Sequence, residues 1–145
     1  MKILILCTGN SCRSQMAEGF FKKFNSDMYV VSAGTEPSSD VNSSAIKVMA
    51  EKGIDISGEK PKNVSKFIND SFDYVITVCD DANETCPVFL GDVKHRLHIG
   101  FEDPAKFVGS EDEVLTGFRR IRDEIEEEFV KLYKSEISPR LNRNS

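Results

Sequence analysis

Short apolar runs alternate along the chain with stretches in which apolar residues recur at helical spacing. Residues 3–6 (Ile-Leu-Ile-Leu) form a run without polar alternation, which is typical of a strand buried on both faces of a parallel sheet. From residue 13 to about residue 24 the apolar positions recur every three or four residues, which predicts a helix that Ser11 or Asn10 is placed to cap. The chain is therefore expected to begin with a strand, a tight loop and a helix.

The same alternation continues toward the C-terminus. Further strands are expected at residues 28–33, 74–78 and, with a weaker pattern, 95–100, and further helices at 42–52, 65–69 and 110–133. This order predicts an α/β fold of three layers, in which helices cover both faces of a four-stranded parallel sheet. The 145 residues fit one compact domain, which we place at residues 1–134. Residues 135–145 have few apolar positions and are expected to form a loosely held tail.

The composition narrows the range of partners and compartments. The 24 acidic and 19 basic residues give a net charge of −5, so the overall field does not favour nucleic acid or an anionic membrane. No apolar run approaches the roughly 20 residues of a membrane span, and the N-terminal run is too short for a signal-peptide core. We therefore expect a cytoplasmic monomer with no nucleic-acid or membrane partner. In such a compartment the four cysteines are expected to be thiols rather than structural disulfides.

Residues that can carry chemistry gather between the first strand and the first helix. Cys7 ends the strand, five residues follow, and Arg13 begins the helix. A loop this short can wrap its N–H groups around one point at the helix N-terminus and so bind an anion. Arg13 adds a planar fork for two oxygens, and Gly9 and Asn10 suit the left-handed backbone of such a wrap. The residues expected to bind the oxyanion are Thr8, Gly9, Asn10, Ser11, Cys12 and Arg13.

Cys7 is the candidate nucleophile. An electropositive loop is expected to lower the pKa of the Cys7 thiol, and a thiolate held against a bound oxyanion can attack it. Ser14, one residue beyond Arg13, is placed to donate a hydrogen bond to that thiolate. The alternative, a buried cysteine that only ends a strand, is disfavoured by the loop and Arg13 together. Cys12 is expected to pack inward, with a second reactive thiol as its alternative.

The stretch CTGNSCRSQMAEG at residues 7–19 resembles the active-site loop of thioredoxin-coupled arsenate reductases, which share the fold of low-molecular-weight protein tyrosine phosphatases. The resemblance covers most of the chain, since it continues through residues 32–34, 77–87, 101–105 and 119–124. It implies reduction of arsenate to arsenite, and hence arsenic detoxification, with phosphate or sulfate as substrate analogues. No bound cofactor or metal is expected, and thioredoxin is the implied electron donor.

The family pattern also implies a general acid at Asp103, which is followed by a proline. Cleavage of a bond from a tetrahedral centre to oxygen needs a proton donor for the departing oxygen. Glu102 is the neighbouring competitor for this role, and an Asp-Pro pair alone more often marks a turn.

The resemblance further implies a relay of three thiols. Cys7 attacks arsenate, Cys79 attacks Cys7 and releases arsenite, and Cys86 attacks Cys79 to leave a Cys79–Cys86 disulfide for thioredoxin. Seven residues of helix would separate Cys79 and Cys86 by roughly 10 Å along the axis, whereas a disulfide needs Cα atoms within about 7 Å. Residues 80–87 are therefore expected to be partly helical and mobile in the reduced protein and to loop out on oxidation.

Three other interpretations stay open at this point. A low-molecular-weight phosphatase would use Cys7 and Asp103 and would not need two further cysteines. Such phosphatases usually carry tyrosines after the Asp-Pro pair, whereas residues 105–107 here are Ala-Lys-Phe. Weak phosphatase activity is still expected from the shared loop. A zinc site would combine Cys79 and Cys86 with the two histidines, although their spacing is not a usual zinc pattern. A non-catalytic redox or metal sensor would keep the cysteines but would not need Asp103.

One position departs from the family pattern. Members with a similar loop often bind potassium through an Asn, a Glu and a Ser that match Asn10, Glu18 and Ser32, together with an Asp that falls at or near Lys62 here. A lysine ammonium in the place of the cation would hold Asn10 and Glu18 without a metal. The alternative is an exposed lysine in a polar loop.

Overall fold

Four parallel strands form a single sheet at the centre of the molecule. The computed structural model describes residues 1–80, 84 and 87–143. The strand order is β2-β1-β3-β4, and every neighbouring pair is parallel. The strands are β1 (Lys2–Cys7), β2 (Tyr29–Gly34), β3 (Ser71–Thr77) and β4 (Asp92–His98). The predicted α/β fold with a four-stranded parallel sheet is confirmed, and the carboxyl ends of the strands meet at one edge, where such sheets bind ligands.

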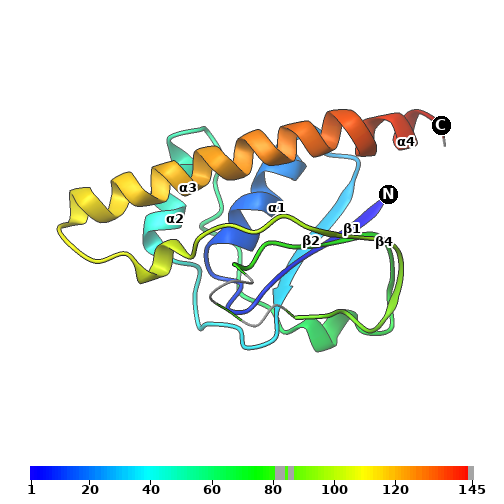
Figure 1. Ribbon diagram of the computed structural model, residues 1–145, viewed down its shortest axis with the longest axis horizontal. Helices are drawn as coiled ribbons and strands as arrows, with labels where there is room; N and C mark the ends of the chain where they lie inside the picture. The colour runs from blue at the N-terminus through cyan, green and yellow to red at the C-terminus, as the bar shows by residue number, and fades with distance from the viewer. Residues whose placement is uncertain (81–83, 85–86, 144–145) are drawn as a thin grey trace.

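Helices cover the two faces of the sheet unequally (Figure 1). The main helices are α1 (Arg13–Phe24), α2 (Ser43–Ala50) and α3 (Glu111–Leu132), whose buried residues share one apolar cluster with Ile3, Ile5 and Ile76 of the strands. The short helix η1 (Val64–Phe67) contributes Phe67 to a smaller cluster, which contains Leu4 and Leu6 from β1. Because side chains alternate along a strand, odd and even residues of β1 enter different clusters. No helix in the described part of the chain is long and apolar enough to cross a membrane.

Polar side chains cap the N-termini of α2 and α3, but no side chain caps α1. Ser110 and Glu113 form a reciprocal capping box at the start of α3, and the Asn42 side chain caps α2 by accepting from the Ser44 amide at 2.8 Å. The residue before α1 is Cys12, which makes no side-chain cap, so the predicted capping by Asn10 or Ser11 is wrong. The Asn10 side chain is instead committed to contacts within the loop that precedes the helix.

The C-terminal segment stays helical beyond α3. A π-helical turn, η3 (Tyr133–Ile137), leads into the short helix α4 (Ser138–Arg143). The Ile137 side chain is fully buried in the main apolar cluster, and Tyr74 of β3 donates a hydrogen bond to Glu136 at 3.2 Å. The structure therefore differs from the loosely held tail that the polar composition predicts, because the Ile137 and Leu141 side chains pack on the main apolar cluster.

Candidate active site

The loop between β1 and α1 borders a cavity of about 570 Å³ at the carboxyl edge of the sheet. Cys7 is the last residue of β1 and Arg13 the first of α1, so the intervening residues must turn within a short span. All the residues predicted to bind the oxyanion line this cavity, together with Cys7. The other lining residues come from elsewhere in the chain: Glu36, Ser38, Glu84, Asp103, Ala105 and Lys106.

Asn10 holds the loop in its turned shape. It is the one non-glycine residue with positive φ in the described part of the chain, at 52°, as the predicted wrap requires. Its side-chain amide donates to Ser14 Oγ at 2.8 Å and to Ser32 Oγ at 2.9 Å. Its Oδ1 accepts from the Lys62 amide at 2.9 Å. Gly9 has no positive φ, so its predicted left-handed conformation is wrong.

Two further residues that the sequence analysis missed support the loop. The fully buried Gln15 donates from Nε2 to the Asn10 carbonyl and to Asn10 Oδ1, both at 3.2 Å. Gly34, the last residue of β2, passes so close that a Cβ there would lie 2.3 Å from the Thr8 carbonyl oxygen. The role of Gln15 could have been suspected from the sequence, because it is a polar residue among the apolar positions of α1. The close contact between Gly34 and Thr8 could not, because it depends on how the strands pair.

Arg13 is buried, and both of its terminal nitrogens are hydrogen-bonded. Its Nη1 and Nη2 both bind the Glu84 carboxylate, the second at 2.9 Å from Oε1, and Nη1 also donates to the Phe101 carbonyl at 3.0 Å. Asp103 Oδ2 lies 3.7 Å from Nη2. Sequence reasoning missed Glu84, because nothing in its local pattern distinguishes it from the neighbouring acidic residues. It lies 71 positions from Arg13 and is brought there by the fold.

The Cys7 thiol is buried beside Arg13, with 3% of its surface exposed. Burial raises its pKa above the ordinary value for a cysteine, and this outweighs the lowering by the Arg13 charge and by a hydrogen bond from the Thr8 amide. The negative charges of Glu84 and Asp103 raise the pKa further. The predicted lowering of the Cys7 pKa is therefore wrong for this state, in which a carboxylate neutralises the arginine.

Asp103 faces the cavity and Glu102 does not. The Asp103 side chain accepts from the Ala105 amide at 3.0 Å and so caps the short helix η2 (Pro104–Lys106), which is the turn role that an Asp-Pro pair commonly plays. Its second oxygen points toward Arg13. Glu102 is exposed and binds Arg120 Nη2 at 2.8 Å on α3. The geometry thus favours Asp103 over Glu102 as the group beside a bound oxyanion.

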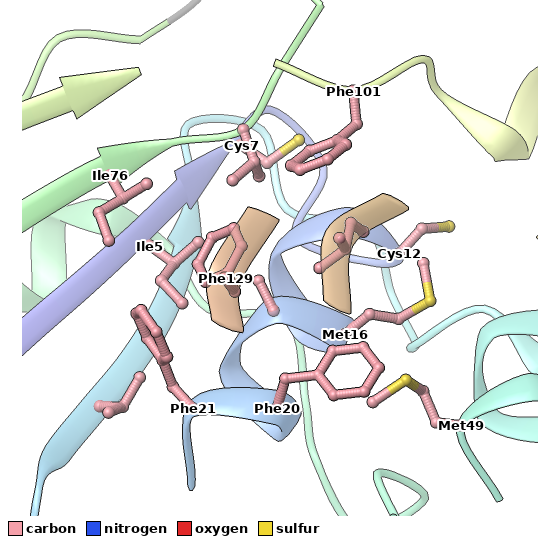
Figure 2. Packing of buried hydrophobic residues seen from close by; sticks show 14 of the residues in the cluster. Ile5, Cys7, Cys12, Met16, Phe20, Phe21, Met49, Ile76, Phe101 and Phe129 are labelled. Carbon is pink, nitrogen blue, oxygen red and sulfur yellow. The ribbon is translucent and has the colours of Figure 1, made fainter. Parts of the chain in front are cut away.

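Cys12 packs inward, as predicted. It is 3% exposed and belongs to the main apolar cluster, where Figure 2 shows it near Met16 at the start of α1. Burial raises its pKa to about 12, which keeps the thiol protonated at neutral pH. Its Sγ lies 3.6 Å from Ser11 Oγ. Cys12 is therefore part of the loop through its backbone, and its buried thiol is not a second reactive group.

Cys79 follows the end of β3 at the same edge of the sheet where β1 ends in Cys7. Leu6 pairs with Thr77, and the Val78 amide donates to the Leu6 carbonyl at 3.0 Å, so Cys79 follows at the level of the loop. Cys79 is fully buried and disulfide-bonded, whereas Cys7 and Cys12 are free thiols. Cys86 lies outside the described residues, as does most of segment 80–87, so the expected rearrangement of that segment stays a prediction.

Three of the residues matched to a potassium site are engaged by groups of the protein itself, while the buried Glu18 Oε1 has no partner among the described residues. The ammonium that reaches Glu18 belongs to Lys22, at 2.7 Å from Oε2, while the Lys62 ammonium binds the Lys60 carbonyl at 3.1 Å. Lys62 contributes its backbone amide to Asn10 instead, and Ser32 Oγ accepts from Asn10. A lysine does neutralise the buried Glu18, but it is not the lysine expected from the sequence.

The alternative zinc site is disfavoured by the positions of the histidines. His95 stacks on the Tyr74 ring at 4.8 Å between centroids, and His98 Nδ1 lies 2.7 Å from Thr77 Oγ1. Residues three apart in a strand point to opposite faces, so these two imidazoles do not converge. Within residues 1–80, 84 and 87–143, no group of three or more His, Cys, Asp or Glu side chains is arranged to hold a metal ion.

Comparison with known proteins finds arsenate reductases among the relatives and the solved structures. An arsenate reductase of Bacillus licheniformis is 50% identical over 126 residues, which cover 86% of this chain and 89% of the relative. An arsenate reductase solved in the phosphate-binding state has a TM-score of 0.75 and 35% identity, over 91% of this chain and 96% of that one. A thioredoxin-dependent arsenate reductase of Corynebacterium glutamicum has a TM-score of 0.67 and 27% identity, over 92% of this chain and 60% of that one.

The match to a protein family spans almost the whole chain. Residues 2–144 match the family described as low molecular weight phosphotyrosine protein phosphatase. Relatives of 48–50% identity carry the name arsenate reductase. The chain belongs to the low molecular weight phosphotyrosine protein phosphatase family, among the members that resemble arsenate reductases.

Proposed function

We propose that this protein reduces arsenate to arsenite, with Cys7 as the nucleophile, and that it thereby serves arsenic detoxification. The observation that carries the proposal is the meeting of Cys7, Arg13 and Asp103 at one cavity, with the buried Cys79 on the adjoining strand end. The loop amides and Arg13 hold the oxygens of a tetrahedral oxyanion. Relatives of about half identical sequence carry the name arsenate reductase, which supports this substrate.

The first chemical step uses Cys7 and Asp103. The Cys7 thiolate attacks arsenic, a sulfur–arsenic bond forms, and one arsenate oxygen leaves as water after protonation, with Asp103 as the proton donor. Ser14 is placed to help, because its Oγ accepts from Asn10 and a hydroxyl that accepts can still donate its own proton to the thiolate. The raised pKa of Cys7 means that thiolate formation depends on the positive charge of Arg13 becoming available to it.

The second step transfers two electrons from sulfur to arsenic. Cys79 attacks Cys7, a disulfide forms between them, the sulfur–arsenic bond breaks, and arsenic leaves as arsenite. Cys86 then attacks Cys79 and frees the Cys7 thiol, and thioredoxin reduces the Cys79–Cys86 disulfide. The disulfide-bonded state of Cys79 and its position beside β1 support a redox role, and the relative from Corynebacterium glutamicum supports thioredoxin as the donor.

A phosphatase reaction is the second candidate function, because the same loop would bind a phosphoester. The described residues that line the cavity include no aromatic side chain, and Ala105 and Lys106 stand beside Asp103 at its rim. An aryl phosphate would therefore lack a ring to stack on, whereas an inorganic oxyanion needs none. We expect phosphatase activity that is weak compared with arsenate reduction.

One experiment separates the two functions. Arsenate-dependent consumption of NADPH is measured with thioredoxin and thioredoxin reductase, beside hydrolysis of an aryl phosphate, for wild type, Cys7→Ser and Cys79→Ser. The proposal expects Cys7→Ser to lose both activities and Cys79→Ser to lose only arsenate reduction. Arsenate reduction at the wild-type rate by Cys79→Ser would refute the relay, and none by the wild type would refute the function.

A further inference from the structure

The anion site of Arg13 already holds an anion from its own chain. The Glu84 carboxylate spans both terminal nitrogens of the guanidinium, and the side chains of Arg13 and Glu84 are only 4% and 11% exposed. A carboxylate presents two oxygens to this fork in the same way as one edge of a tetrahedral oxyanion. The two ligands cannot both use Nη1 and Nη2, so an oxyanion that binds this end of the guanidinium has to displace Glu84, which leaves only the buried Nε without a partner among the described residues.

The ion pair also changes the thiol beside it. The hydrogen bond from Arg13 keeps the pKa of Glu84 below its usual range, so the carboxylate stays ionised at neutral pH. Its negative charge offsets the arginine and contributes to the raised pKa of Cys7. Glu84 therefore opposes both requirements of the reaction, which are a free guanidinium and a Cys7 thiolate.

Glu84 is tied to the backbone that follows Cys79. The Asp80 amide donates to Glu84 Oε2 at 2.8 Å, and the Glu84 amide donates to the Asp80 carbonyl at 2.8 Å. Asp80 directly follows Cys79, which is disulfide-bonded in this structure. The Glu84 carboxylate is thus hydrogen-bonded to the residue that directly follows the disulfide-bonded Cys79.

We propose that Glu84 is an internal competitor for oxyanions at Arg13, and that it excludes them while Cys79 is in a disulfide. The oxidised protein then does not bind a new oxyanion until it has been reduced. The competition itself needs only the observed ion pair, whereas its dependence on the redox state rests on the proposed reductase function.

The test measures binding of inorganic phosphate by isothermal titration to the oxidised and the reduced protein. In the oxidised protein, Glu84→Gln is expected to lower the Kd for phosphate at least about tenfold, because a charge-assisted competitor is removed. Glu102→Gln is the matched control, since Glu102 is an exposed carboxylate that binds Arg120 and does not line the cavity. It removes the same charge and is expected to change the Kd less than about twofold.

A second measurement covers the case in which Glu84→Gln does not fold. In the wild type alone, reduction of the disulfide is expected to lower the Kd for phosphate, and an equal Kd in both states would overturn the redox dependence. For a folded variant, the pH at which Cys7 reacts half-maximally with iodoacetamide is expected to fall relative to wild type. A purely structural role of Glu84 would not lower that pH.

The outcomes separate this proposal from the proposed function. Equal phosphate affinity of oxidised wild type and Glu84→Gln would overturn the competition, whatever the protein does with arsenate. Tighter binding by Glu84→Gln to the same extent in both redox states would support the competition and overturn the redox dependence. Loss of arsenate turnover in wild type, with the Glu84→Gln effect intact, would count only against the reductase function.

Discussion

Substitution of Gly34 by alanine tests how tightly β2 supports the oxyanion loop. A Cβ at this position would lie 2.3 Å from the Thr8 carbonyl oxygen and 3.2 Å from the Asn10 amide nitrogen. Ordinary contact begins at 3.4 Å, so strand and loop would have to separate by about 1 Å. The Thr8 carbonyl cannot turn away freely, because it accepts from the Glu36 amide at 3.0 Å.

Two quantities are expected to change in Gly34→Ala. Overpacking of this kind costs about 1–3 kcal/mol of the free energy of unfolding, measured by urea titration. A displacement of roughly 1 Å in the loop is expected to lower the rate of arsenate reduction about 100-fold. Phosphate affinity, measured by isothermal titration, is expected to fall in parallel, since the same amides bind it.

Gly58→Ala is the matched control, because a Cβ at Gly58 would meet nothing within 4 Å. It is expected to leave activity unchanged and to stabilise the protein by less than about 1 kcal/mol through the unfolded state. The reasoning about the loop would be refuted if Gly34→Ala bound phosphate and unfolded as Gly58→Ala does.

Three further predictions concern the tail, the nucleophile and the buried carboxylate. Ile137→Ala is expected to lower the free energy of unfolding, measured with urea, by about 2–5 kcal/mol, because Ile137 is fully buried. Lys134→Ala is the control and is expected to lower it by less than about 0.5 kcal/mol, because Lys134 is exposed. Equal losses in the two variants would mean that the tail is not anchored. Because its pKa is raised, Cys7 is expected to be mostly protonated at neutral pH. Its rate of alkylation is then expected to reach half of its maximum only above about pH 8.5. A half-maximal rate at a lower pH would contradict this prediction. Since Lys22 neutralises Glu18, replacing sodium by potassium is expected to leave the Tm unchanged. Lys22→Met is expected to lower the free energy of unfolding by about 1–3 kcal/mol, because it leaves a buried carboxylate without its partner. A wild-type Tm that rises with potassium would argue for a bound ion.

The sequence by itself determined the elements and the reactive loop. Buried strands and amphipathic helices follow from the periodicity of apolar residues, which is a property of the local chain. The ends of α2 and α3 follow from Asn42 and Ser110, whose side chains bond to amides two or three residues away. The Cys7 and Arg13 spacing predicts an anion site for the same reason, since all its parts lie within one strand, loop and helix.

Only the tertiary structure decided which charges meet in the site. Arg13 binds Glu84 from 71 positions away, and Glu18 is neutralised by Lys22 rather than Lys62. The Cys7 pKa is raised above its ordinary value, whereas the loop alone predicts that it is lowered. Burial and the distance between charges set these properties, and both depend on how distant segments pack and not on local sequence. Hence the sequence identifies Cys7 as the candidate nucleophile, while the fold sets the ionisation of its thiol and places the Glu84 carboxylate on Arg13.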